Sequence, residues 1–336
     1  MRLITKSVGK STINKNGDVI IIEDVKRVLI TRPNHRLGNQ LLMTPLIEEV
    51  TEIFPNCKID LFVKGNIASI LFENHENIDT IIKLPKNHFK QIIQYIKGWM
   101  SLRAKRYDIA INGAKNSSSG RLSVKFSKSN YKYFGDTDTD LQLKYDDYNH
   151  IAKYPVYDFR NYVSKLGIKI SDHKIPSLDI KLSSFEIAEG KKKLLEFVDK
   201  EKRTICLFTF ATGDKCYSEA WWLEFYNRLK IEYANYNFIE VLPVENISKI
   251  AFKAPSFYSK DIREICSLMA NCDIFIGADS GIMHLSSASQ TKTVGLFSVT
   301  DIDRYQPYNN SSLGINTNDV DTDGIIKEID KILLNK

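Results

Sequence analysis

The residues best suited to chemistry follow a short apolar run at 273–277. Asp279, Ser280 and Gly281 come directly after it, and His284 lies one helical turn beyond Ser280. A strand that leads into a helix here presents free backbone N–H groups, a hydroxyl and a glycine that allows close approach, which suits a phosphate or diphosphate group. In the structural alternative, Asp279 or Ser280 only caps the helix and His284 packs inside the protein.

Two motifs far apart in the chain resemble one known family. The first, within 28–46, reads Val-Leu-Ile-x-Arg and then Leu-Gly-Asn-x-Leu-Leu-x-Thr-Pro-Leu. The second, within 279–301, reads Asp-Ser-Gly-x-Met-His-Leu and then Thr-Val-x-Leu-Phe-x-x-Thr-Asp. In this order they resemble the motifs of glycosyltransferase family 9, the heptosyltransferases. The resemblance implies a GT-B fold: two doubly wound, Rossmann-like α/β domains with a cleft between them, the first for the acceptor and the second for a nucleotide sugar.

The resemblance also implies donor-binding residues in the second half. Those implied for the sugar and diphosphate of an ADP-heptose-like donor are Asp279, Ser280, Gly281 and His284. Glu245 is implied as a contact to the nucleoside, and Thr212 and Gly213 as loop contacts. Because a GT-B site generally uses lysine and helix ends in place of a metal, we expect no metal and no cofactor.

A weaker match concerns Lys215, which stands ahead of a tryptophan pair at 221–222. By resemblance, Lys215 neutralises the charge that builds on the departing diphosphate during transfer. The alternative is a surface lysine in a loop.

The N-terminal motif departs from the family at its catalytic position. Asn39 stands where the family has an aspartate that takes the proton of the acceptor hydroxyl, and asparagine cannot accept that proton. Three hypotheses follow. His35 in the same loop is the base; or Asn39 only orients the hydroxyl while a phosphate or carboxylate of the substrate takes the proton; or the protein binds donor with little activity. The other residues of this acceptor-side loop are Arg32, Arg36, Gly38 and Thr44.

The elements that must position these residues alternate between strand-like and helix-like patterns, which favours an α/β protein with parallel sheets. The predicted strands are 25–31, 58–63, 78–84, 107–111, 131–134, 204–210, 238–242, 273–277 and 293–297. The helices predicted in the second half are 182–198, 221–233, 261–271, 280–289 and 323–334.

Four segments are predicted along the chain. Residues 1–24 form an extension with a hairpin turn at Asn16-Gly17. An acceptor-binding domain covers 25–170 and a nucleotide-sugar-binding domain covers 171–320, joined by a linker at 167–179. The last segment, 321–336, is a helix expected to pack back on the N-terminal domain.

Composition narrows the class of protein. The chain has 336 residues, of which 43% are hydrophobic and 26% charged, as in a globular protein. No apolar run approaches the roughly 20 residues needed to cross a membrane, and residues 1–12 do not read as a signal peptide, so we expect a cytoplasmic protein. The five cysteines are expected to be reduced. Gly9-Lys10-Ser11-Thr12 lacks the earlier glycine and strand of a P-loop, which argues against a nucleoside triphosphatase.

Charge is uneven along the chain, although the net charge is only +6. Between residues 83 and 132 there are twelve Lys or Arg residues and one acid, Asp108. Such a stretch either attracts an anionic partner, such as a phosphorylated glycolipid, an acidic membrane surface or nucleic acid, or is simply a solvated surface. A nucleic-acid-binding role would leave the donor motif unexplained, so no nucleic acid is expected.

Two further segments allow a functional and a structural interpretation. Residues 87–106 form a basic amphipathic helix that either lies on an anionic membrane or, the favoured interpretation, buries its apolar stripe. The acidic run 136–140 either binds a metal through nucleotide phosphates or, the favoured interpretation, is a solvated loop.

The sequence therefore predicts an inverting glycosyltransferase. It would transfer a sugar, such as heptose from ADP-heptose, to an anionic glycan or glycolipid such as a lipopolysaccharide core. The protein would have at most peripheral contact with the inner membrane. The alternatives are a transferase for another nucleotide sugar and a nucleotide-sugar-binding protein with little activity.

Overall fold

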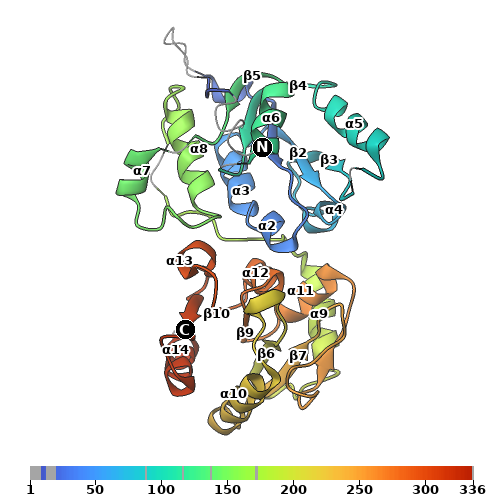
Figure 1. Cartoon of the computed structure of the whole chain (residues 1–336), viewed down its shortest axis with the longest axis vertical. Helices are drawn as coiled ribbons and strands as arrows, with labels where there is room; N and C mark the ends of the chain where they lie inside the picture. The colour runs from blue at the N-terminus through green and yellow to red at the C-terminus, as the bar shows by residue number, and fades with distance from the viewer. Residues whose placement is uncertain are drawn as a thin grey trace. The chain divides into compact units, whose positions relative to one another are not determined.

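The computed structural model describes residues 9–12, 20–87, 89–115, 117–136, 138–170 and 173–334. The chain divides into two compact units, Met1–Pro176 and Ser177–Lys336, each built on its own sheet (Figure 1). The division falls inside the predicted linker 167–179. The hairpin turn expected at Asn16-Gly17 lies outside the described residues.

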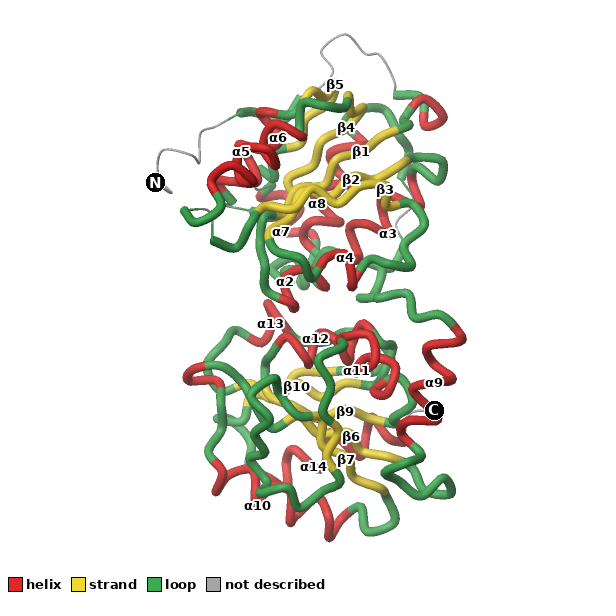
Figure 2. Tube along the Cα trace, turned by 90° about the vertical axis from the view of Figure 1, so that its right-hand side faces the viewer, coloured by secondary structure: helices red, strands yellow, loops and turns green. Residues whose placement is uncertain are grey.

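The N-terminal unit has a five-stranded parallel sheet in the order β3-β2-β1-β4-β5. Its strands are β1 (Arg27–Arg32), β2 (Lys58–Lys64), β3 (Ile78–Leu84), β4 (Arg106–Asn112) and β5 (Lys128–Tyr133). Its helices are η1 (Ile22–Asp24), α2 (Leu37–Leu41), α3 (Thr44–Ile53), α4 (Ala68–Leu71), α5 (Ile92–Ser101), α6 (Ser118–Phe126), α7 (Thr139–Lys144) and α8 (Tyr154–Ser164). In Figure 2, α5 and α6 lie on one face of this sheet and α3 and α8 on the other. With both faces covered, β1 is buried almost throughout, and its centre is the apolar run Val28-Leu29-Ile30.

The C-terminal unit has a six-stranded parallel sheet in the order β11-β10-β9-β6-β7-β8. Its strands are β6 (Thr204–Phe208), β7 (Asn237–Val241), β8 (Ser256–Phe257), β9 (Ile274–Ala278), β10 (Thr293–Phe297) and β11 (Leu313–Asn316). Its helices are α9 (Ser184–Leu194), η2 (Gly213–Lys215), α10 (Glu219–Glu232), α11 (Ile262–Met269), α12 (Gly281–Ala288), α13 (Ile302–Tyr305) and α14 (Thr322–Leu334). The predicted α/β class with two doubly wound sheets is confirmed.

Strand order fixes where a ligand is expected in each unit. In both sheets the order reverses in the middle, between β1 and β4 in the first and between β6 and β9 in the second. Loops that leave such a pair at their carboxyl ends diverge to opposite faces, and the gap between them is the usual ligand position of doubly wound sheets. The loops after β1, β4, β6 and β9 are therefore the ones to inspect.

The terminal helix does not follow its prediction. We expected it to pack on the N-terminal domain, but the apolar face of α14 enters the core of its own unit, where Ile325 and Ile329 join Trp222 and Leu229. Tyr233 of α10 also donates a hydrogen bond to Asp330 Oδ1 at 2.8 Å. α14 is buried in this way because β11 and α10 leave an apolar surface that a helix with isoleucines at helical spacing fits.

The amphipathic segment around α5 also differs from the favoured prediction. Only Gly98 of this helix is buried, while Tyr95 and Trp99 are half-buried against the sheet and the isoleucines are exposed. No helix in the described part of the chain is both long enough and apolar enough to span a membrane.

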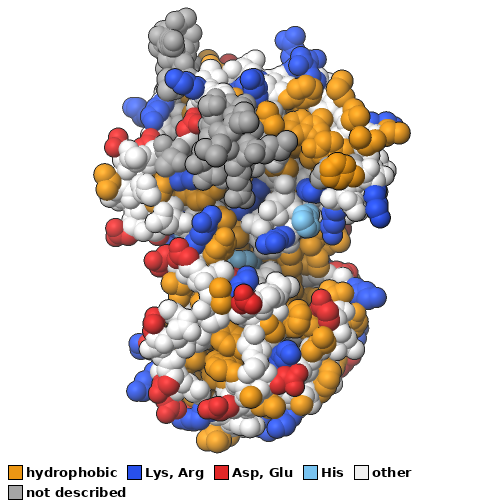
Figure 3. Space-filling view, viewed as in Figure 1, with side chains coloured by type: hydrophobic (Ala, Val, Ile, Leu, Met, Phe, Trp, Pro, Cys, Tyr) orange, Lys and Arg blue, Asp and Glu red, His pale blue; other side chains and the backbone are white. Residues whose placement is uncertain are grey.

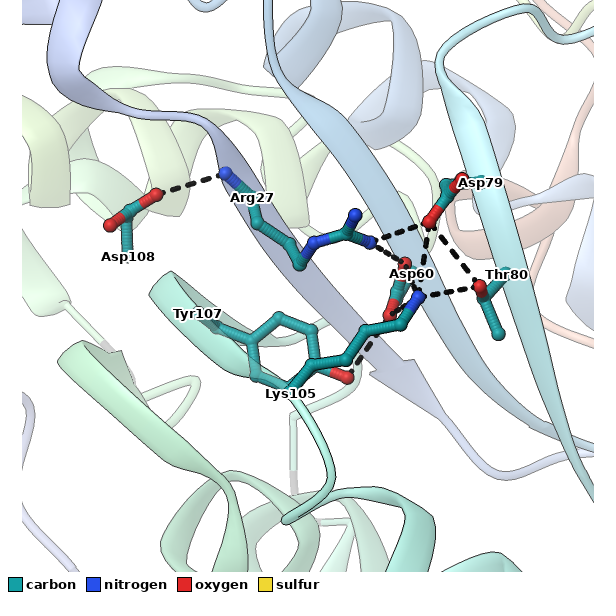
Figure 4. Close-up of polar contacts among 7 residues, drawn as sticks. All are labelled: Arg27, Asp60, Asp79, Thr80, Lys105, Tyr107 and Asp108. Atoms are coloured by element: carbon teal, nitrogen blue, oxygen red, sulfur yellow. Dashed lines mark hydrogen bonds and ion pairs between the residues drawn. The ribbon is translucent and has the colours of Figure 1, made fainter.

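A buried carboxylate crosslinks the amino-terminal edge of the first sheet (Figure 4). Asp60 of β2 is fully buried and accepts hydrogen bonds from Arg27 at 2.7 Å and from the hydroxyl of Tyr107 at 3.1 Å. Lys105 lies 3.1 Å from the same carboxylate and 3.0 Å from Asp79. Lys105 and Arg27 thus serve the fold, at the edge of the sheet away from the loops where a ligand is expected.

The outer edge of β5 is covered by the short segment 9–12. The N–H of Thr12 donates to the carbonyl of Lys132 at 2.9 Å, and the N–H of Phe134 donates to Ser11 Oγ at 3.2 Å. The sequence of this segment resembles the end of a P-loop, but the segment lies along an edge strand.

Candidate functional site

An ion pair joins the two loops at the strand reversal of the C-terminal sheet. Lys215, at the end of η2 after β6, places its Nζ 3.0 Å from Oδ2 of Asp279, which directly follows β9. Asp279 is 4% exposed, and its Oδ2 also accepts a hydrogen bond from Thr300 Oγ1 at 2.5 Å. Two of the predicted donor-side residues, 64 positions apart in the chain, therefore meet where a ligand is expected.

The start of α12 adds backbone donors beside this pair. Ser280 is the N-cap, and its Oγ accepts from the N–H of Met283 at 3.2 Å. The N–H groups of Gly281 and Ile282, the first of the helix, have no partner within the helix by its geometry and point out of its end. Ser280 is therefore a cap, as the structural alternative holds, and the helix end it caps still offers two N–H groups to an anion.

His284 lies on the buried side of α12. Its side chain is largely buried, with the ring centre 6.5 Å from that of Tyr305. In this position it packs beneath the helix end rather than standing on its surface.

The loop after β6 combines an exposed turn with an aromatic support. Thr212 and Gly213 are exposed, and Gly213 has φ +66°, a left-handed conformation that side chains disfavour. Behind the turn, the ring of Tyr217 stacks on that of Trp221 with centres 4.3 Å apart, and Tyr217 shares a hydrogen bond with Thr317. The turn that carries Lys215 is thus backed by a packed aromatic layer.

Glu240 is a buried carboxylate that the sequence reasoning missed. It is fully buried at β7 and accepts a hydrogen bond from Thr209 Oγ1 at 2.6 Å, and burial raises its pKa. Thr209 in turn accepts from the N–H of Lys249, so the network joins the loops after β6 and β7. Glu245, the predicted nucleoside contact, lies exposed in the second of these loops.

In the N-terminal unit, the predicted loop after β1 is anchored by buried polar groups. Arg32 is buried and donates to the carbonyl of Leu42 at 3.3 Å, and Thr44 is buried and donates to the carbonyl of Leu41. The buried amide of Gln40 donates to the carbonyls of Asn34 and Lys64, at 2.8 and 3.1 Å. Gln40, an unassigned position of the motif, ties the loop after β1 to the end of β2.

The anchored loop presents His35, Arg36 and Asn39 to its surface side. His35 and Arg36 are exposed and Asn39 is half-buried in α2, next to the buried Gly38. Desolvation lowers the pKa of His35 below its ordinary 6.5, and the charges of Lys64, Lys86 and Arg36 lower it further. His35 is therefore largely neutral near pH 7 and able to accept a proton.

Lys115, in the loop after β4, is a second residue that the sequence reasoning left among the general basic stretch. Its Nζ lies 3.6 Å from the ring centre of Tyr148, 4.3 Å from that of Tyr154 and 3.7 Å from Asp158 Oδ2. Burial lowers the pKa of Lys115 and raises that of Asp158 to about 6. Doubly wound sheets usually bind ligands at the carboxyl ends of the two strands where the strand order reverses. Lys115 lies in the loop after β4, and His35 lies in the loop after β1, the other strand of that pair.

Two carboxylates of the acidic run 136–140, those of Asp136 and Asp138, serve the fold. Asp136 pairs with Arg121 at 2.9 Å and accepts from Ser11, while Asp138 caps α7 and accepts from Asn161. Within the described ranges, one group has carboxylates and imidazole close enough to hold a metal: Glu49, Glu52 and His173. Glu49 is already bound bidentately by Arg160, so this group reads as an ion-pair network rather than a metal centre.

Comparisons with known proteins point to one family. Residues 259–323, which include Asp279, His284 and Thr300, match the model of the family described as Glycosyltransferase family 9 (heptosyltransferase). A lipooligosaccharide heptosyltransferase 2 of Campylobacter jejuni is 41% identical over 51 residues, which are 15% of this chain and 16% of that protein. The aligned part thus spans about a sixth of this curated relative.

Solved structures match over nearly the whole chain. The glycosyl transferase family 9 protein of Veillonella parvula has a TM-score of 0.73 at 17% identity, over 95% of this chain and 99% of the other. E. coli heptosyltransferase WaaC with ADP has a TM-score of 0.67 at 14% identity, over 91% and 99%. E. coli ADP-heptose lps heptosyltransferase II has a TM-score of 0.66 at 16% identity, over 92% and 98%.

These similarities confirm the family resemblance and the GT-B-like fold. The family match at 259–323 includes Asp279, the partner of Lys215, and the start of α12.

Proposed function

We propose that this chain, with its glycosyltransferase family 9 pattern and GT-B-like fold, is an inverting glycosyltransferase that uses an ADP-heptose-like donor. One observation carries the proposal. The Lys215–Asp279 pair lies at the start of α12, at the strand reversal of the sheet, and the family match covers Asp279 and α12. The similar fold of E. coli heptosyltransferase WaaC with ADP and of E. coli ADP-heptose lps heptosyltransferase II supports the choice of donor.

In the proposed reaction, Lys215 and the N–H groups of Gly281 and Ile282 hold the diphosphate. The acceptor hydroxyl oxygen forms a bond to the sugar's anomeric carbon from the opposite side as the bond from that carbon to the diphosphate oxygen breaks. Negative charge grows on the departing diphosphate oxygen, and a fixed ammonium and a helix N-terminus stabilise it. Asp279 is itself anionic, so it suits a different role: it holds the Lys215 ammonium and accepts hydrogen bonds from sugar hydroxyls. This chemistry requires neither a metal nor a cofactor.

The acceptor is proposed to be an anionic glycan or glycolipid on the cytoplasmic side of the inner membrane, bound by the N-terminal unit. Lys115 offers a positive charge at the strand reversal of that unit, with its side chain 16% exposed. Exposed Arg36 lies in the loop after β1. The chain would contact the membrane only peripherally, and no nucleic acid takes part.

The first experiment is calorimetric binding of ADP, followed by transfer of sugar from ADP-heptose to a lipopolysaccharide-core acceptor. We expect ADP to bind more tightly than UDP or GDP, and Asp279→Ala to weaken ADP binding more than tenfold, since it releases Lys215. Glu224→Ala removes an exposed carboxylate of α10 and is the matched control. Failure of any nucleotide diphosphate to bind would refute the donor site; binding without transfer, restored by Asn39→Asp, would identify a binding protein that has lost its base.

We further propose that His35 takes the proton of the acceptor hydroxyl. The replacement His35→Gln should lower kcat roughly a hundredfold, as expected for loss of a general base. Because the pKa of His35 is lowered, activity of the native chain should hold at pH 7 and fall only as the pH drops below that pKa. This acid limb of the pH profile should be absent in His35→Gln.

A rescue experiment separates this role from a structural one. Asn39→Asp restores a carboxylate at the family's usual position, so it should recover activity in the His35→Gln background. Unchanged kcat in His35→Gln would assign the proton to the substrate's own phosphate or carboxylate instead.

A further inference from the structure

One side of α5 and the turn before it is apolar and open to solvent. Five side chains make this surface, called here the α5 apolar face: Phe89, Ile92, Ile93, Ile96 and Met100, with 54 to 84% of their surface exposed. At 100° per residue, the four within the helix fall in one arc of about 100°. Tyr95 and Trp99 lie beside that arc and pack on the sheet, so the helix already has its contact with the core through other residues.

A groove continues the apolar surface toward α6. It has a volume of about 380 Å³ and is lined by Tyr95, Ile96, Trp99, Met100, Leu122 and Phe126. Every lining side chain is aromatic or aliphatic. The groove and the α5 apolar face share Ile96 and Met100, so an apolar chain lying in the groove would meet the exposed face of the helix.

Cations surround this surface. Lys90 and Lys97 are exposed on the α5 segment, and the guanidinium of Arg103 lies 5.3 Å from the ring centre of Phe126 at the groove. Figure 3 shows hydrophobic side chains gathered at the position of α5, with Lys and Arg side chains at the margin of the patch. The one acid of residues 83–132, Asp108, accepts the N–H groups of Lys26 and Arg27 at the edge of the sheet.

An exposed apolar helix face with lysine and arginine around it matches the surface of an anionic bilayer. Apolar side chains enter the acyl boundary while the cations stay among the headgroups. Each such cation near an anionic surface raises affinity about fivefold. We propose that the α5 apolar face docks this chain on an anionic lipid bilayer, with α5 lying in the interface and one acyl segment entering the α5–α6 groove.

Helix α5 would then make the membrane contact of the proposed function. The docking rests on that function only in the choice of membrane. Docking is measured without donor or acceptor, so its outcome is independent of ADP binding. Failure of docking with intact ADP binding would refute the membrane surface alone.

The test is flotation of the full chain with vesicles of phosphatidylcholine, with and without about a third phosphatidylglycerol. Native protein should float with the anionic vesicles and remain behind with the neutral ones, and brominated acyl chains should quench the fluorescence of Trp99. Ile93→Asp with Ile96→Asp should lower the vesicle partition coefficient at least tenfold. Both side chains are exposed, so the fold should be unaffected.

Two comparisons make the result specific. Ile231→Asp changes an equally exposed isoleucine of α10 and should leave partitioning unchanged. Lys90→Ala with Lys97→Ala should weaken binding and reduce its salt dependence. Equal flotation of native protein and the double aspartate variant, or a dimer that the aspartates dissociate in place of vesicle binding, would overturn the proposal.

Discussion

Lys215→Ala should lower kcat for sugar transfer by about three orders of magnitude, the cost of losing a fixed group that stabilises charge in the transition state. Lys215 is held by Asp279 at 3.0 Å, so its ammonium is in place before the donor bond breaks. KM should change less than kcat, because the charge on the diphosphate oxygen grows only as that bond lengthens. Steady-state kinetics with ADP-heptose measure both constants.

Two further variants show whether the loss in Lys215→Ala comes from the missing charge at this position. Lys215→Arg keeps the positive charge and should retain much more activity than alanine. Lys331→Ala removes an exposed lysine of α14 that also pairs with a carboxylate, Glu328, and should leave kcat unchanged. Similar losses in Lys215→Ala and Lys331→Ala would mean that Lys215 has no part in the transfer step.

Arg160→Ala should destabilise the N-terminal unit by about 3–5 kcal/mol, because it removes the guanidinium that binds a buried carboxylate and leaves only the imidazole of His173 beside it. Glu49 of α3 is fully buried and receives two hydrogen bonds of 2.7 Å from the guanidinium of Arg160 on α8. Arg160 also donates to the carbonyl of His173 at 2.7 Å. One side chain thus joins two helices and the segment that leads out of the unit.

The measurement is hydrogen exchange in increasing urea, since peptides report each unit separately and the C-terminal unit serves as an internal reference. The double variant Glu49→Met with Arg160→Leu removes both charges and should recover most of the lost stability. Lys193→Ala breaks an exposed pair with Glu196 and should have an effect of at most about 0.5 kcal/mol. Equal losses in the single and double variants would show that packing, and not the unpaired charge, is responsible.

Sequence reasoning identified the nine longer strands, most of them because they contain a short apolar run. The exception is β5, Lys128–Tyr133, which is mostly polar and was predicted from its aromatic end only, as 131–134. It missed β8 and β11, which have two and four residues, too few to show a pattern. The meeting of Lys215 with Asp279 follows from strand order, which brings β6 beside β9 although two strands and several helices separate them in the chain. Family resemblance supplied both residues, and the topology explains why they are neighbours.

Other features depended on packing that a single sequence does not show. The apolar spacing of α14 predicts a buried face but not which unit buries it, and here the core around Trp222 does so. The spacing in α5 is similar, yet the sheet covers only the side of Tyr95 and Trp99. Lys115 looked like one lysine among many until the loop after β4 placed it beside Tyr148 and Asp158.

The short segment 9–12 has a consequence for how copies of this protein behave at high concentration. An open edge strand offers unpaired N–H and C=O groups on which another chain's strand can build, and this is a common start of aggregation. On β5 the residues around Ser11 and Thr12 already use part of that edge, and in the second sheet the edge strands β8 and β11 are too short to serve as templates. A variant without residues 9–12 would lose this cover, so this segment helps to keep copies of the folded chain from pairing through β5.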